Sequence, residues 1–319
     1  MDFGFSIPTR GPLAAPQHVV ALARKAEELG FTYVGVPDHV IIPRSFAPNY
    51  PYSTDGDFGE GKDGNCLEQI ALIAFLAGAT SSLRFVTSVM VVPHRNPILT
   101  AKMLATIDIM SGGRITVGCG AGWLAEEIEA LNTAPYAERG RVTDEYIAVF
   151  RELWCADNPS FEGAYARFSN IIFSPKPVQK PHPPIWTGGE SPPALRRAAR
   201  LANGWYPIGL NPRHPLDTPD RYATALVKLK SLAEAAGRDP GAIDLALFSI
   251  WYDETTEAAL PEGGRRALTG STEAILDDVN RYAELGVRHL TVNLRAATFE
   301  GTVERVERFA ADVIARAPD

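Results

Sequence analysis

The segment LRFVTSVMVVPHRNPILTAKMLATIDIMSGGRITVGCGAGWLAEE, from Leu83 to Glu127, shows how this 319-residue chain is organised. Its first run, Arg84 to Val92, is apolar and β-branched for longer than an exposed, alternating strand allows, which predicts a strand buried on both faces. Ile115 to Cys119 predicts a second short buried strand. Two such strands joined by a helix form the right-handed unit from which parallel barrels are built.

The helix between these strands has clear boundaries. Asn96 is a good N-cap and Pro97 suits the first helical position, while Gly112-Gly113 ends the helix. Apolar residues recur at helical spacing and predict one buried face. These residues are Leu99, Met103, Leu104, Ile107 and Met110.

About eight units of this kind follow one another along the chain. We expect strands at 3–7, 34–36, 84–92, 115–119, 185–187, 205–208, 243–250 and 289–293. We expect helices at 16–29, 67–80, 97–111, 137–154, 192–201, 218–236, 271–285 and 302–317. The pattern predicts an α/β protein with a (β/α)8 TIM barrel, one domain spanning residues 1–319, and insertions after strands 2, 4 and 7.

Two insertions carry aromatic residues. The loop 40–66 is polar but contains Phe46, Tyr50, Tyr52 and Phe58. It is either a lid over a flat apolar ligand or a surface excursion with packed aromatics. The segment 155–183 predicts a hairpin outside the barrel.

Composition excludes several classes of function. The chain has 31 basic and 38 acidic residues and a net charge of -7, which gives no electrostatic reason to expect nucleic acid or an anionic membrane as partner. Cys66, Cys119 and Cys155 form no CxxC pair, which argues against disulfides and zinc and favours the cytoplasm. The N-terminal sequence lacks the pattern of a signal peptide, and no apolar run approaches the roughly 20 residues of a membrane span.

The ligand of such a barrel binds at the C-terminal ends of the strands. The loop Thr187 to Ser191 joins a strand, paired glycines and a helix start, which is the arrangement of a phosphate site, although any such loop can use Gly-Gly for turning. The segment Gly118 to Gly122 lets a flat ring approach the backbone closely. Cys119 within it is expected to be a small buried hydrophobe rather than a nucleophile.

Two polar pairs end neighbouring strands. His39, beside Asp38, can act as a general acid or hydrogen-bond a ring, but taken alone the pair is more typical of an Asp cap with a satisfied histidine. His94-Arg95 can neutralise an acidic group or pair on the surface. Glu126-Glu127 and the run 138–141 are expected to start helices and form structural ion pairs.

As an ordered set, the motifs of almost the whole chain resemble the luciferase-like monooxygenase superfamily, and more closely its branch that uses the deazaflavin coenzyme F420. The motifs that carry this resemblance are Pro37-Asp38-His39, Thr87-Ser88-Val89, His94-Arg95-Asn96-Pro97, Ala101-Lys102, Ala105-Thr106-Ile107-Asp108, Ser111-Gly112-Gly113-Arg114, Gly118-Cys119-Gly120-Ala121-Gly122-Trp123, Glu162-Gly163, the run 175–181, the run 186–192 and Gly204-Trp205.

The resemblance implies a site at the barrel mouth. F420 would lie with its ring beside a bulged third strand, where a non-prolyl cis peptide, by position Ser88-Val89, contacts the ring. His39 matches the histidine at the ring and is the expected catalytic residue. The expected cofactor-binding residues are Asp38, Ser88, Val89, Gly120, Gly122, Trp123, Thr187, Gly188, Gly189, Glu190 and Ser191.

The resemblance also implies hydride transfer between the deazaflavin and a small organic substrate, with no metal, in a homodimer. The sugar-phosphate dehydrogenases of this branch carry a Glu acid where this chain has Trp123, so their substrate and protonation scheme are not carried over. The alternatives are an FMN-dependent monooxygenase using reduced flavin and O2, and a non-catalytic flavin-binding barrel.

Overall fold

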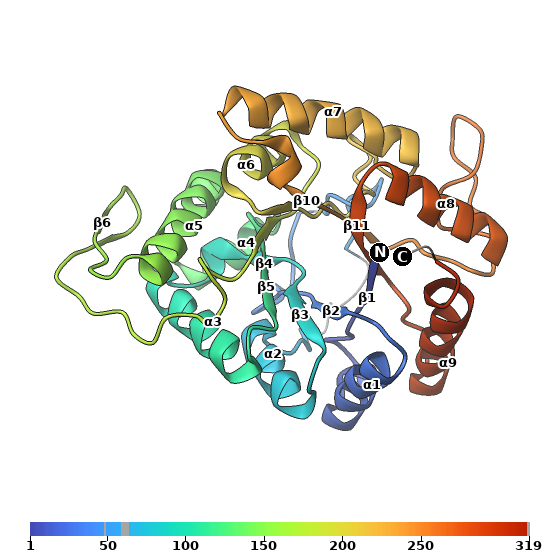
Figure 1. Cartoon of the computed structure of the whole chain (residues 1–319), viewed down its shortest axis with the longest axis horizontal. Helices are drawn as coiled ribbons and strands as arrows, with labels where there is room; N and C mark the ends of the chain where they lie inside the picture. Colours follow the sequence, from blue (N-terminus) through green and yellow to red (C-terminus); the bar gives the residue numbers. More distant parts are fainter. Residues whose placement is uncertain (48, 59–63, 318–319) are drawn as a thin grey trace.

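A computed structural model of the chain describes residues 1–47, 49–58 and 64–317. Within these residues, eight parallel strands close a barrel, because β3 pairs with β5 and β1 pairs with β11. The (β/α)8 prediction is therefore confirmed (Figure 1). The barrel strands are β1 (Asp2–Ser6), β2 (Tyr33–Val36), β3 (Arg84–Thr87), β5 (Ile115–Gly120), β8 (Ile185–Thr187), β9 (Gly204–Trp205), β10 (Asp244–Ser249) and β11 (Val287–Val292).

Helices surround the strands on all sides in Figure 1. Their expected N-caps form: the Asn96 side chain accepts hydrogen bonds from the N–H groups of the first turn of α3, and Thr218 does the same for α7. The helices are α1 (Pro16–Glu28), α2 (Gln69–Ala79), α3 (Pro97–Ser111), α4 (Ala125–Leu131), α5 (Arg139–Cys155), α6 (Pro192–Leu201), α7 (Pro219–Ala235), α8 (Thr272–Glu284) and α9 (Phe299–Phe309), which continues into a π turn (Ala310–Ile314).

The buried face of α3 differs from the prediction. Leu99 and Met110 are 57% and 81% exposed, whereas Ala101 and Ala105 are fully buried. Small residues face inward because α5 packs closely here, with the Trp154 indole donating to the Ala101 carbonyl at 3.0 Å. Leu104 and Ile107 are buried as predicted and Met103 packs against the core, so the periodicity was wrong only for Leu99 and Met110.

The insertions leave the barrel between strands and helices. The predicted hairpin is present as β6 (Phe161–Glu162) and β7 (Arg167–Phe168), which pair antiparallel and project from the side of the barrel. Of the expected lid loop 40–66, residues 48 and 59–63 lie outside the described residues. In the part of the chain that is described, no helix combines the length and apolarity needed to cross a bilayer.

The third strand is interrupted at its C-terminal end. β3 ends at Thr87, the peptide bond Ser88-Val89 is cis as expected, and β4 (Met90–Val91) resumes pairing with β5. A Cβ on Gly118 would come closer than 3.0 Å to the Thr87 carbonyl oxygen, and one on Gly120 would strike the Val89 side chain. These glycines thus first make room for the protein's own interrupted strand.

This close approach predicts a sharp contrast between two glycine substitutions. Gly118→Ala should lower the free energy of unfolding by about 3 kcal/mol, because the added methyl meets backbone that cannot move aside. Gly78→Ala, where nothing lies within 4 Å of the added Cβ, should raise it by about 0.5 to 1 kcal/mol. Urea unfolding of both variants measures the difference, and equal effects would contradict the packing described here.

Candidate active site at the C-terminal end of the barrel

The centre of the site is a hydrogen bond between the segment after β2 and helix α4. His39 Nδ1 lies 2.7 Å from Glu127 Oε2, and the other oxygen, Oε1, accepts the backbone N–H groups of Val40 at 2.7 Å and Ile41 at 3.1 Å. His94 Nε2 lies 3.8 Å from the same carboxylate. One buried carboxylate thus gathers two histidines and two amides.

The protonation of this cluster follows from its bonds. Burial alone would raise the pKa of Glu127, but the hydrogen bond from His39, the neighbouring histidines and the Val40 amide outweigh it and lower that pKa. Burial lowers the pKa of His94, so His94 is held neutral. An ionised carboxylate only accepts hydrogen bonds, so His39 Nδ1 carries a proton and Nε2 is left for a ligand.

Sequence reasoning missed the role of Glu127. Acidic residues in the first turn of a helix are commonly explained by the helix dipole, and Glu126-Glu127 fit that explanation. The Glu127 side chain is instead 1% exposed, and its partner His39 lies 88 positions away in sequence. The only local signal is a carboxylate four residues after Trp123 at a strand's C-terminal end.

The Asp38 carboxylate is hydrogen-bonded to other residues of the protein. Its carboxylate accepts two hydrogen bonds from the Arg95 guanidinium, both at 2.8 Å, and one from the Val91 amide at 2.9 Å. Arg95 also donates to Glu68, at 2.6 Å for its shorter bond, so the half-buried Arg95 pairs with two carboxylates of the protein while His94 is buried. Asp38 therefore fixes β4, and its carboxylate oxygens are used by bonds within the protein.

The aromatic residues of the loop after β2 gather on Trp123. The ring centroids of Tyr50, Phe58 and Phe46 lie 5.2, 5.3 and 6.0 Å from that of Trp123. The His39 ring lies 5.3 Å from Phe58. Loop aromatics, Trp123 and the histidine thus form one cluster, an arrangement that both the lid and the surface excursion with packed aromatics allow.

The loop after β8 contains two different kinds of residue. Glu190 is buried and accepts the amides of Ile208 and Gly209, both at 2.8 Å, so it fixes the segment after β9. Burial raises the pKa of this carboxyl. Ser191 occupies the N-cap position of α6, but its hydroxyl makes no capping bond. Pro192 and Pro193 offer no N–H, which leaves Ser191 as the principal side-chain donor here.

The expected site residues fall into two groups. Thr187 is in register with Cys119, which lies in the core between strands and helices, so the Thr187 side chain is on the helix side of the sheet. Thr187, Asp38 and Glu190 are buried supports. The remaining residues lie at the C-terminal ends of the strands: His39, Ser88, Val89, Gly120, Gly122, Trp123, Gly188, Gly189 and Ser191.

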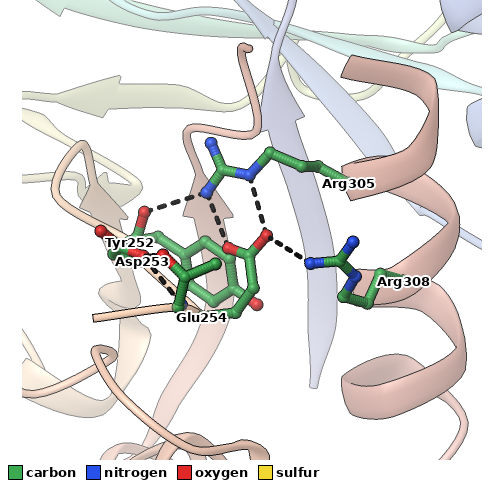
Figure 2. Close-up of a pocket in the computed structure, with 6 residues that line it drawn as sticks. Tyr252, Asp253, Glu254, Arg305 and Arg308 are labelled. Carbon is green, nitrogen blue, oxygen red and sulfur yellow. Dashed lines mark hydrogen bonds and ion pairs between the residues drawn. The ribbon is translucent and has the colours of Figure 1, made fainter. Parts of the chain in front are cut away.

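Two other features are structural. Cys119 is fully buried, and burial raises the pKa of its thiol to about 12, which agrees with the expected inert role. A cavity of about 320 Å³ lies between the segment after β10 and α9. Arg305 donates there to Glu254 at 2.7 and 2.9 Å, and Figure 2 shows these side chains facing one another. These charges satisfy one another and attach the loop to the helix. Among the described residues, no group of three or more His, Cys, Asp or Glu could hold a metal.

Comparison with known proteins agrees with this barrel. Residues 1–289 match the family model of luciferase-like monooxygenases. An uncharacterized protein of Mycobacterium bovis is 30% identical over 99% of this chain and 96% of its own length. The FMNH2-dependent dimethylsulfone monooxygenase of Pseudomonas putida is 38% identical over 150 residues, 46% of this chain and 40% of that enzyme.

Solved structures show the same fold. The coenzyme F420-dependent tetrahydromethanopterin reductase of Methanopyrus kandleri superposes with a TM-score of 0.75 at 18% identity, covering 99% of each chain. The monooxygenase RslO1 of Streptomyces bottropensis gives a TM-score of 0.75 at 23% identity, also over 99% of each chain.

The barrel and the match of residues 1–289 to this family model together define a luciferase-like oxidoreductase. The chain belongs to the luciferase-like monooxygenase family.

The His39–Glu127 pair makes a testable prediction about a proton. In Glu127→Gln the amide nitrogen can donate to His39 Nδ1, so the imidazole hydrogen should move from Nδ1 to Nε2. Two-bond 15N–1H spectra of histidine-labelled protein distinguish these tautomers, and His39→Gln assigns the signal.

Glu129→Gln is the matched control, because Glu129 is an exposed carboxylate on the same helix. It should leave the His39 signal unchanged. An unaltered tautomer in Glu127→Gln would show that the carboxylate does not set the proton position.

Proposed function

We propose that the protein is an F420-dependent oxidoreductase acting on a small organic substrate, with His39 as the acid-base or orienting group. The observation that supports it best is the buried Glu127 carboxylate, which accepts a hydrogen bond from His39 Nδ1. His39 follows β2, and β2 pairs with β3, the strand that ends just before the cis Ser88-Val89 bond. Such an arrangement presents one defined ring nitrogen to a ligand. It resembles the carboxylate–histidine pairs that fix a catalytic imidazole in other enzymes.

The residues at the mouth suit a cofactor with a flat ring and a phosphate. Gly188 and Gly189 let the loop turn close to the Val89 and Ala194 side chains, Gly189 having a φ of 96°, and the Ser191 hydroxyl makes no capping bond at the start of α6. Val89 and Trp123 provide apolar surface at the C-terminal ends of neighbouring strands, and the Trp123 ring lies 6.4 Å from that of His39. When bound, the deazaflavin supplies the hydride chemistry, and the protein supplies placement and electrostatics.

The side chains then divide the remaining work. Glu127 keeps the His39 ring in one tautomer and orientation. His39 Nε2 holds or donates a proton at the reacting end of the ligand. Tyr50, Phe58 and Trp123 exclude water from this region through their mutual packing.

A second candidate is an FMN-dependent monooxygenase that uses reduced flavin and O2. The observation that favours it is the 38% identity to the dimethylsulfone monooxygenase, which is named as FMNH2-dependent. The two candidates share the fold and the phosphate loop, so the cofactor itself distinguishes them.

Cofactor titration of the purified protein tests the proposal. F420 should bind more tightly than FMN, as followed by cofactor fluorescence. Ser191→Ala should weaken F420 binding about ten- to hundredfold, the effect of losing a hydrogen bond to a charged phosphate, while leaving stability nearly unchanged because no cap bond is lost.

Thr218→Ala provides the converse control. This hydroxyl does cap a helix, so its loss should lower the free energy of unfolding by about 1 kcal/mol without altering cofactor binding. Preference for FMN together with oxygen consumption would favour the monooxygenase. Binding of neither cofactor would contradict both candidates.

A further inference from the structure

Helices α5 and α6 enclose a basic groove on the outside of the barrel. A cavity of about 270 Å³ lies between the first turns of α5 and the length of α6 and is lined by four arginines and one carboxylate. We name it the α5–α6 groove; its lining residues are Ala137, Gly140, Arg141, Asp144, Pro193, Arg196, Arg197, Arg200 and Leu201.

Two of the four arginines are occupied by the protein. Arg197 is buried and donates to Asp144 at 2.5 Å and to the Gly140 carbonyl at 2.9 Å, which fastens α6 to α5. Arg141 lies 3.2 Å from Glu138. These two pairs build the walls of the groove and leave its charge positive.

Arg196 and Arg200 have no hydrogen-bond or ion-pair partner among the described residues, and both are exposed. They stand four residues apart on α6, so they lie on one face, where like charges destabilise a helix by a few tenths of a kcal/mol. The helix dipole explains a cation in the last turn, such as Arg200, but gives no reason for Arg196, which lies beyond the first turn. The pair is therefore positioned for an anion that the protein does not provide.

The groove begins where the proposed phosphate loop ends. Pro193, which lines it, is two residues after Ser191, and the groove continues along α6 to Leu201, about 12 Å at 1.5 Å per residue. On the opposite wall, α5 is tied to the mouth because Arg139 Nε donates to the Gly122 carbonyl at 3.0 Å. A ligand chain leaving the phosphate loop over Pro193 therefore meets Arg196 and then Arg200.

We infer that the α5–α6 groove binds the acidic oligoglutamate tail that extends beyond the phosphate of F420, with Arg196 and Arg200 contacting its carboxylates. This inference rests on the proposed function and adds a site outside the barrel mouth. FMN ends at its phosphate, so it has no acidic tail that could bind in the α5–α6 groove. The groove thus supplies a physical reason for this chain to prefer the deazaflavin.

The test compares cofactors that differ only in their tails. Wild-type protein is titrated with F420 carrying several glutamates, with F420 lacking all glutamates, and with FMN. We expect the tailed form to bind about tenfold more tightly than the tail-less form, the effect of two partly exposed charge pairs, and this preference to shrink as salt is added.

The variant Arg196→Gln/Arg200→Gln should bind both forms of F420 with the affinity of the tail-less form. The matched control is Lys230→Gln/Arg288→Gln, which removes two positive charges from exposed side chains on α7 and β11. It should retain the tenfold preference, which separates a local effect of the groove from a change in net charge.

The possible results separate the two hypotheses. Equal affinity of wild-type protein for tailed and tail-less F420, or a preference that survives in Arg196→Gln/Arg200→Gln, would overturn the tail site while leaving F420 as cofactor. Failure of either form of F420 to bind, with FMN bound instead, would overturn the proposed function and the tail site together.

Discussion

The mouth of this barrel depends on one buried carboxylate. Glu127 accepts hydrogen bonds from His39, Val40 and Ile41, and it lies beside the neutral His94. A buried charge is tolerated only when its partners stay in place, so the segment after β2 cannot shift without a large cost. The loop whose aromatic side chains pack on Trp123 follows directly after the residues that Glu127 holds. The positions of His39, of the loop after β2 and of its aromatic residues therefore all depend on the hydrogen bonds to Glu127.

Much of the fold could be predicted because its signals are local. Buried β-branched runs gave the strands, and the residue pairs Asn96-Pro97 and Thr218-Pro219 gave two helix starts, since a cap and its proline act within one turn. The cis bond at Ser88-Val89 was implied by resemblance to a family and is present. The same kind of reasoning brought His39 and Trp123 to one place, where their rings lie 6.4 Å apart.

What could not be predicted depends on partners distant in sequence. Asp38 was expected at the cofactor, but Arg95, 57 positions away, occupies its carboxylate. On the inward face of α3, Ala101 and Ala105 are buried beside the predicted Leu104 and Ile107, because Trp154 approaches from another helix, which no periodicity within α3 reveals. Glu127 was predicted to be an ordinary helix-start residue, because its partner His39 is also distant in sequence. In each case the side chain's role is set by a neighbour that only the closed barrel provides.

The distribution of charge connects the mouth with the outer groove. Carboxylates near the mouth, Glu127 and Asp38, are hydrogen-bonded to their own partners, whereas Arg196 and Arg200 have no such partner among the described residues. The chain as a whole carries a net charge of -7, so it does not attract an acidic ligand at long range. Screening limits exposed charges to about 8 to 10 Å in physiological salt, so the arginines act only on a ligand already held nearby. A phosphate bound at Ser191 would bring an attached acidic chain within that distance, which is why the groove is useful only as an extension of the mouth.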